Sequence, residues 1–122
     1  LDEGTTWESL LFASHHKLNN LNIIIDYNKI QSLGNVDKII NLEPLKKKFL
    51  AFGCHVIEVD GHNVAQIHKS LKSNSYSKPR IIIAHTIKGK GVSFMENNNL
   101  WHYRSPDKKE LNLALKELNN HA

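Results

Sequence analysis

Three short polar segments each follow an apolar run, and each contains residue types that bind ligands. They are Asn28–Gln31, Asp60–Asn63 and Thr86–Gly91. In open sheets of parallel strands, ligands bind outside the carboxyl ends of the strands. The Asn28 amide oxygen and a nearby backbone carbonyl are hard ligands suited to Mg²⁺. Both are neutral, so they predict a metal site only if a carboxylate and a ligand phosphate complete it. Otherwise Asn28 simply ends a strand.

Spacing alone leaves the other candidate side chains ambiguous. His102 has aromatic and Arg neighbours and suits contact with an anionic ligand, or it is an ordinary packed or surface histidine. The glycines and lysines of 86–91 lack the Gly-x4-Gly-Lys-Ser/Thr spacing of a phosphate-binding P-loop. Glu3 and Glu8 cap a helix and complement its dipole, or they form a carboxylate pair that a partner's acid completes.

Composition indicates one ordinary globular domain covering residues 1–122. Hydrophobic residues make up 40% and charged residues 23% of the chain. The net charge of +4 is not concentrated in a stripe, so we expect no nucleic-acid partner, whereas a phosphorylated small molecule suits a mildly basic surface. A single cysteine excludes a disulfide scaffold. Apolar runs are too short for a membrane span and no signal peptide is visible, so we expect a cytoplasmic protein.

Helical and strand patterns alternate along the chain. Strands are predicted over residues 21–27, 55–60 and 80–86, and helices over residues 6–18, 44–52, 63–71 and from 105 onward. This alternation is typical of a three-layer α/β/α parallel sheet. Three consecutive isoleucines, Ile23–Ile25, predict a strand buried on both faces. Because three strands make a thin sheet, we expect further strands upstream or from a partner chain.

Cap residues and apolar spacing predict the helix ends and buried faces. We expect Thr5 and Glu8 to form a capping box, Asn63 to cap the third helix, Gly53 to end the second and Ser105 to cap the last. The predicted core faces contain Trp7, Leu10, Leu11, Ser14 and Leu18, then Val64, Ile67, His68 and Leu71, then Leu111, Ala114, Leu115 and Leu118.

Six separated segments together resemble one family, the transketolases. The likeness is greatest to the N-terminal subunit of split bacterial and archaeal transketolases and covers nearly the whole chain. The matching segments, in family order, are Asp2–Glu8, Asp26–Gln31, Leu42–Leu45 with Ala51–Gly53, Glu58–His62, Thr86–Asn97 and Trp101–His102.

The resemblance implies a thiamine diphosphate-binding fold, of which residues 1–122 form the C-terminal portion. It also implies an enzyme that uses thiamine diphosphate and Mg²⁺ to transfer a two-carbon ketol unit from a ketose phosphate to an aldose phosphate, with the cofactor as electron sink. The expected partner is a pyrimidine-binding, C-terminal transketolase domain or subunit. The assembly would be a homo- or hetero-oligomer, and the chain alone would be inactive.

The resemblance also implies roles for particular residues. The Asn28 side chain and the Ile30 carbonyl match two Mg²⁺ ligands. Ile87 matches a hydrophobic contact to the cofactor, and His102 matches a histidine that contacts the cofactor diphosphate and approaches the substrate.

Glu3 and Glu8 match acids that form a proton relay with a catalytic Glu of the partner. The family's Gly-Asp-Gly motif, which supplies the charged metal ligand, is expected immediately upstream of Leu1. Tyr103 departs from the family pattern, which has Gly after Trp-His, and we expect its bulk to crowd the diphosphate end of the site.

Three other functions remain open from the sequence. A deoxyxylulose phosphate synthase-like enzyme shares the fold, although Asp2–Gly4 follows the transketolase pattern better. A non-catalytic, degenerate subunit of the same fold fits the departure at Tyr103. A basic nucleic-acid binder is the third alternative.

Overall fold

The computed structural model describes residues 1–73 and 77–120, which form two compact units. The sheet unit contains Leu1–Tyr27 and Ile40–Thr86, and the loop unit contains Asn28–Ile39 and the chain from Ile87 onward. The elements in order are α1 (Gly4–His15), β1 (Asn22–Tyr27), β2 (Ile30–Gln31), β3 (Gly34–Asn35), α2 (Val36–Ile39), α3 (Leu45–Ala51), β4 (His55–Asp60), α4 (Val64–Lys72), β5 (Arg80–His85), the 3-10 helix η1 (Asn99–His102) and α5 (Lys108–Asn120).

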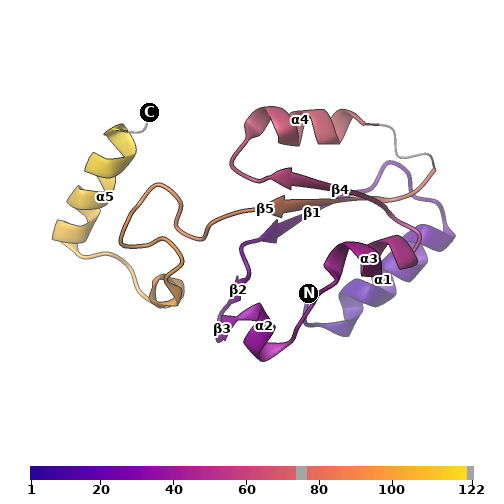
Figure 1. Ribbon diagram of the computed structural model, residues 1–122, viewed down its shortest axis with the longest axis horizontal. Coiled ribbons are helices and arrows are strands. Elements are labelled where there is room, and N and C mark those ends of the chain that lie inside the picture. The colour runs from indigo at the N-terminus through magenta and orange to yellow at the C-terminus, as the bar shows by residue number, and fades with distance from the viewer. Residues whose placement is uncertain (74–76, 121–122) are drawn as a thin grey trace. The chain divides into compact units, whose positions relative to one another are not determined.

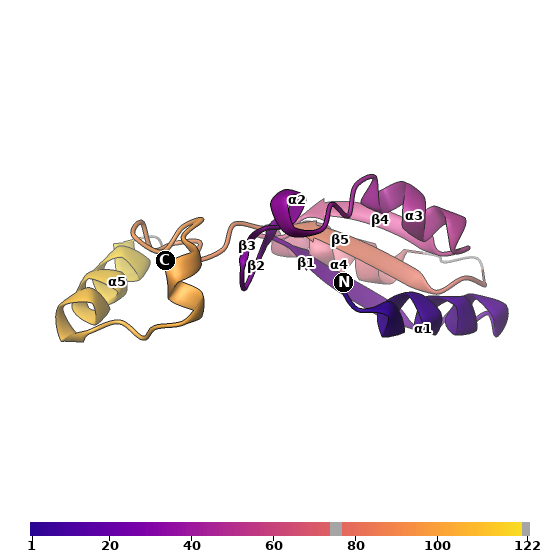
Figure 2. The same ribbon diagram turned by 90° about the horizontal axis from the view of Figure 1, so that it is seen from below.

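Three parallel strands form the sheet of the sheet unit, in the order β1-β5-β4. Figures 1 and 2 show α1 and α3 on one face of this sheet and α4 on the other. The predicted three-layer α/β/α arrangement is therefore confirmed. Each predicted strand is present to within one residue, because its apolar run is bounded by polar or glycine residues.

The core lies on both sides of β5, the central strand. Ile82 and Ala84 pack with Val59 of β4 and Ile67 of α4. On the opposite side, α3 contributes the fully buried Phe49, whose ring stacks on Trp7 of α1 at a centroid distance of 5.5 Å. Because β5 is the central strand and helices cover both faces of the sheet, Ile81–Ala84 are all buried.

The prediction that β1 is buried on both faces is wrong. Ile24 is 53% exposed, although its register partner Ile82 is fully buried. β1 is an edge strand of the described sheet, and α4 packs on β4, at the opposite edge. One face of β1 is therefore left partly open to solvent.

Two of the predicted helix caps are wrong. α1 begins at Gly4 with Glu3 as its N-cap residue and no side-chain cap, so Thr5 lies inside the first turn and no capping box forms with Glu8. At α5, Asp107 replaces the predicted Ser105, and its Oδ1 accepts the N–H groups of Lys109 and Glu110 at 2.8 and 2.9 Å.

Other helix ends agree with the sequence. Asn63 Oδ1 accepts the Gln66 N–H at 3.0 Å and caps α4. Gly53 follows α3 with a φ of +81°, a conformation that glycine adopts without a steric penalty. α1 ends at His15, three residues earlier than predicted; His16 is its C-cap residue, and Lys17 then has a φ of +52°.

Several predicted buried faces are exposed. Leu10 and Ala114 are buried as expected, but Leu11 and Val64 are largely exposed. On α5, three of the four predicted core residues, Leu111, Leu115 and Leu118, are also exposed. Apolar periodicity identifies an amphipathic helix but does not ensure that a surface within the same chain covers it.

Phe49→Ala is expected to lower the free energy of unfolding by about 3–5 kcal/mol, because it leaves a cavity beside Trp7 in the core. Phe12→Ala on α1 is the matched control, since Phe12 is 62% exposed, and should cost less than about 1 kcal/mol. Urea unfolding of the chain measures both. Equal losses in the two variants would contradict the described core.

Candidate functional site

The carboxyl ends of the three strands are tied to one another. Thr86 follows β5, and its hydroxyl donates to the carboxylate of Asp26 on β1. The N–H of Gly61, which follows β4, donates to the His85 carbonyl at 2.8 Å. A Cβ on Gly61 would lie 3.1 Å from that carbonyl and 2.4 Å from the Thr86 methyl group, so only glycine fits there. The three candidate segments therefore start from strand ends that are held in fixed positions relative to one another.

A cluster of hydrogen-bonded polar side chains lies at this edge, on the face covered by α3. The Tyr27 hydroxyl donates to Glu43 Oε1 at 2.5 Å, and the other oxygen of Glu43 accepts the Leu45 N–H at 2.9 Å. These two bonds join the end of β1 to the start of α3.

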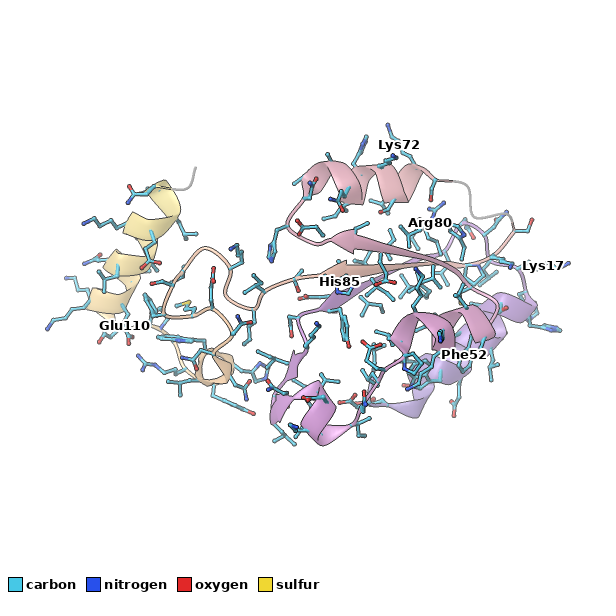
Figure 3. All side chains as sticks on the ribbon, viewed as in Figure 1. Lys17, Phe52, Lys72, Arg80, His85 and Glu110 are labelled. Atoms are coloured by element: carbon cyan, nitrogen blue, oxygen red, sulfur yellow. The ribbon has the colours of Figure 1, made fainter. Side chains whose placement is uncertain are left out.

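Glu58 of β4 completes the cluster, which lines a pocket of about 190 Å³. Its carboxylate lies 2.9 Å from Nε2 of His85, labelled at the end of β5 in Figure 3, and 3.1 Å from the Lys46 ammonium. The hydrogen bonds from His85 and then Lys46 hold the pKa of Glu58 below its ordinary value. Sequence reasoning missed this cluster; its only signal is the placement of Glu58 and His85 near strand ends.

In the loop unit, one hydrogen bond joins the two residues that are predicted to bind the metal. Asn28 Oδ1 accepts the Ile30 N–H at 2.9 Å, which forms an Asx turn across Lys29 (φ +63°). Val36 N–H donates to the Lys29 carbonyl at 2.9 Å and closes the β2–β3 hairpin behind this turn. An amide oxygen has two lone pairs, so Asn28 Oδ1 keeps one for a cation.

The glycine-rich loop after β5 is held by its own hydrogen bonds. Half-buried Ile87 begins it, and its carbonyl accepts the Lys90 N–H at 3.2 Å. Glu96 Oε1 accepts the Gly91 N–H at 3.2 Å and lies 3.5 Å from the Lys90 ammonium. A Cβ on Gly89 would lie 2.5 Å from the Met95 carbonyl oxygen. Lys90 is therefore paired within the loop unit, and the loop is an internally hydrogen-bonded turn in which Gly89 and Lys90 remain exposed to solvent.

Residues 101–104 have three anchored side chains and one without a hydrogen bond. Trp101 Nε1 donates to the Phe94 carbonyl at 2.9 Å, the Tyr103 hydroxyl donates to the Ser32 carbonyl, and Arg104 pairs with Glu110 of α5. The exposed His102 imidazole meets the Tyr103 ring edge-on at 4.9 Å. Within the described chain it has no hydrogen bond or ion pair, so its nitrogens remain available to a ligand.

Glu3 and Glu8 belong to the sheet unit, and the other four predicted site residues belong to the loop unit. Glu3 is the N-cap residue of α1 and Glu8 lies one turn further on; both are exposed.

Asp60 and His62 form a turn in which Asp60 Oδ1 accepts the His62 N–H at 2.9 Å. This arrangement is that of a turn between β4 and α4 rather than of a catalytic pair.

The donor set in this chain is incomplete for a divalent cation. Across residues 1–73 and 77–120, no three His, Cys, Asp or Glu side chains gather as a metal site. Asn28 and Ile30 supply neutral oxygens, so the positive charge of a metal requires carboxylate or phosphate oxygens from outside this set. In the same described residues, no helix is long and apolar enough to cross a membrane.

Comparison with known families and solved structures gives one answer. The family model described as "Transketolase, thiamine diphosphate binding domain" matches residues 1–119. The chain superimposes on the crystal structure of transketolase from Campylobacter jejuni with a TM-score of 0.86 and 31% identity, covering 96% of this chain and 18% of that one. Transketolase from Leishmania mexicana, at 21% identity and a TM-score of 0.64, shares the fold; the match covers 97% of this chain and 21% of that one.

Curated relatives include single subunits and complete enzymes. One subunit of the apulose-4-phosphate transketolase of Actinobacillus succinogenes is 43% identical over 119 residues, which cover 97% of this chain and 43% of that protein. A 6-deoxy-6-sulfo-D-fructose transketolase subunit of Clostridium sp. is 40% identical, with 96% and 43% covered. Human transketolase is 34% identical, with 97% and 19% covered. The chain thus spans less than half the length of these relatives.

Glu58→Gln is expected to lower the free energy of unfolding by about 0.2–1 kcal/mol near pH 7, the range for exposed ion pairs. Because folding lowers the pKa of Glu58, its contribution is present above the ordinary value of 4.5 and is lost as pH falls through the lower folded value. The free energies of unfolding of the wild-type chain and of Glu58→Gln, measured with urea, should therefore become equal in acid.

Asp37→Asn serves as the control, since Asp37 pairs with the adjacent, exposed Lys38 at 3.7 Å and should change stability less. A deficit of Glu58→Gln that persists undiminished at about pH 3 would contradict this account of the cluster.

Proposed function

The chain belongs to the transketolase family, within its thiamine diphosphate-binding domain, and from this premise we propose that it forms the diphosphate-binding part of a ketol-transferring enzyme. Residues 1–122 would be the C-terminal portion of that domain. The enzyme would move a two-carbon ketol unit between sugar phosphates with thiamine diphosphate and Mg²⁺.

The observation that best supports this proposal is the Asx turn at the start of the loop unit. The Asn28 amide oxygen is fixed by the Ile30 N–H at 2.9 Å, which keeps the two residues of the expected ligand pair in a defined relation. Asn28 Oδ1 and the Ile30 carbonyl would hold Mg²⁺ together with cofactor phosphate oxygens and a carboxylate from elsewhere in the protein. The neutral donor set fits this shared arrangement.

His102 and Ile87 would contact the cofactor. The exposed imidazole of His102 has no hydrogen bond within the described chain and is suited to donate one to a diphosphate oxygen. Half-buried Ile87 opens the internally bonded glycine loop and would supply an apolar contact. Bound thiamine diphosphate would supply the electron sink, and these residues would orient it.

The remaining catalytic groups would require a partner. Glu3 and Glu8 are exposed at the start of α1, where a catalytic carboxyl from a pyrimidine-binding domain or subunit could join them in a proton relay. The Actinobacillus and Clostridium relatives are named as subunits. We therefore propose a homo- or hetero-oligomeric, cytoplasmic enzyme.

The substrate would be a sugar phosphate. One relative is named for apulose 4-phosphate and another for 6-deoxy-6-sulfo-D-fructose, so the sugars named for similar chains differ but are both anionic. A mildly basic chain suits anionic sugars of this kind.

Asn28→Ala in the full-length assembled protein is expected to abolish binding of thiamine diphosphate with Mg²⁺, because it removes a metal ligand. His102→Ala should weaken binding by about tenfold, the loss of one charge-assisted hydrogen bond. Titration calorimetry measures both. The controls are Asn112→Ala on α5 and His68→Ala on α4, two exposed positions outside the proposed site. Unchanged binding by Asn28→Ala would refute the metal assignment.

The isolated chain should show no turnover of xylulose 5-phosphate with ribose 5-phosphate, because its charged metal ligand and partner acid are supplied elsewhere. The assembled protein should transfer the ketol unit from a sugar phosphate donor. Product from pyruvate and glyceraldehyde 3-phosphate would instead indicate a deoxyxylulose phosphate synthase-like reaction. An assembly that binds no cofactor would favour a degenerate subunit.

A further inference from the structure

His102 lies in a segment that is fastened on both sides. Trp101 Nε1 donates to the Phe94 carbonyl, and the Trp101 ring packs against the Phe94 ring, tilted by 57°, at a centroid distance of 5.1 Å. The Arg104 guanidinium lies 4.5 Å from the centre of the Trp101 ring. These contacts fix η1 to the glycine-rich loop and to the start of α5. They do not tie it to the segment that contains Asn28 and Ile30.

The Ser32 backbone carbonyl makes a connection of that kind. The Ser32 carbonyl, in the turn between β2 and β3, accepts the Asn99 side-chain N–H at 2.9 Å and also the Tyr103 hydroxyl. Asn99 and Tyr103 lie at the two ends of η1, and 71 residues separate Tyr103 from Ser32. Both lone pairs of this carbonyl are therefore used to hold η1 against the hairpin.

Tyr103 is not a core residue, so burial of its side chain does not explain its role. Its side chain is 64% exposed, so the hydroxyl bond and the ring contact with His102 are its main interactions. The ring meets the imidazole edge-on, at an interplanar angle of 86°. One side chain thus contacts both the hairpin that follows Asn28 and the histidine proposed to bind the diphosphate.

Resting on the proposed function, we propose that Tyr103 is a positioning residue for the cofactor site. Its hydroxyl fastens the His102 segment to the hairpin that contains Ile30, and its ring limits the orientation of the imidazole. Tyr103 thereby sets the spacing between the diphosphate contact and the metal ligands, a role that differs from crowding the diphosphate.

The test is a double-mutant cycle in the full-length protein assembled with its partner, with thiamine diphosphate and saturating Mg²⁺ as probes in calorimetry. Tyr103→Phe removes only the hydroxyl and should weaken cofactor binding by about threefold to tenfold. In a His102→Ala background the same change should alter binding less than about twofold, because the group that Tyr103 positions is gone.

Ser93→Ala is the matched control, since it removes a hydroxyl bond to Glu117 (2.8 Å) elsewhere in the loop unit and should leave affinity within about twofold. Unchanged or tighter binding by Tyr103→Phe would overturn the inference. Equal losses with and without His102 would also overturn it, by showing a general stabilising role. Failure of the wild-type assembly to bind cofactor would instead overturn the proposed function.

Discussion

The register of β5 between its two neighbours is the constraint on which the proposed site depends. Arg80 pairs with Asn22 on one side and with His55 on the other, so all three strands begin and end at the same level. Tyr27, Asp60 and His85 therefore end their strands along one edge. Because parallel strands direct their carboxyl ends the same way, the segments that start with Asn28, Gly61 and Thr86 leave from that edge. A slip of one residue would reverse the faces of β5 and separate Thr86 from Asp26.

The amino-terminal edge of the sheet is fixed by a different device. Arg80, labelled at the start of β5 in Figure 3, is buried, and its guanidinium donates to the Leu71 carbonyl at 2.9 Å and to Asn22. A positive charge near the last carbonyls of α4 also complements the helix dipole. The two edges are thus held by different means: by a buried cation at one, and at the other by hydrogen bonds between Thr86 and Asp26 and between the Gly61 N–H and the His85 carbonyl.

Local signals in the sequence predict much of this fold. The apolar runs predict the strands, Asn63 and Gly53 mark helix ends, and Asn28 follows the end of β1 as expected. Predictions from the sequence fail where contacts between distant parts of the chain determine burial. Ile24, for example, is exposed because β5, and not β1, is the central strand of the described sheet.

Long-range pairs were equally invisible to spacing arguments. Glu58 meets His85 across 27 residues, and Tyr103 meets Ser32 across 71. The family resemblance identified Tyr103 as a departure and predicted crowding. The structure adds a partner for its hydroxyl that no local pattern reveals.

The chain's chemistry is organised so that other components complete it. The proposed metal donors are neutral, the exposed acids at the start of α1 have no third carboxyl gathered with them in the described residues, and His102 has no hydrogen bond there. The neighbours of His102, Trp101 and Arg104, are nonetheless held by a hydrogen bond and an ion pair. This combination of fixed surroundings and unsatisfied ligands is what a shared active site requires, because binding then costs little reordering of the protein.

The most direct test is a crystal structure of the assembled, full-length protein with thiamine diphosphate and Mg²⁺. We expect Mg²⁺ at about 2.0–2.1 Å from both Asn28 Oδ1 and the Ile30 carbonyl oxygen, with a His102 nitrogen in hydrogen-bonding range of a diphosphate oxygen. A metal bound without Asn28, or a cofactor diphosphate remote from the β2–β3 hairpin, would contradict it.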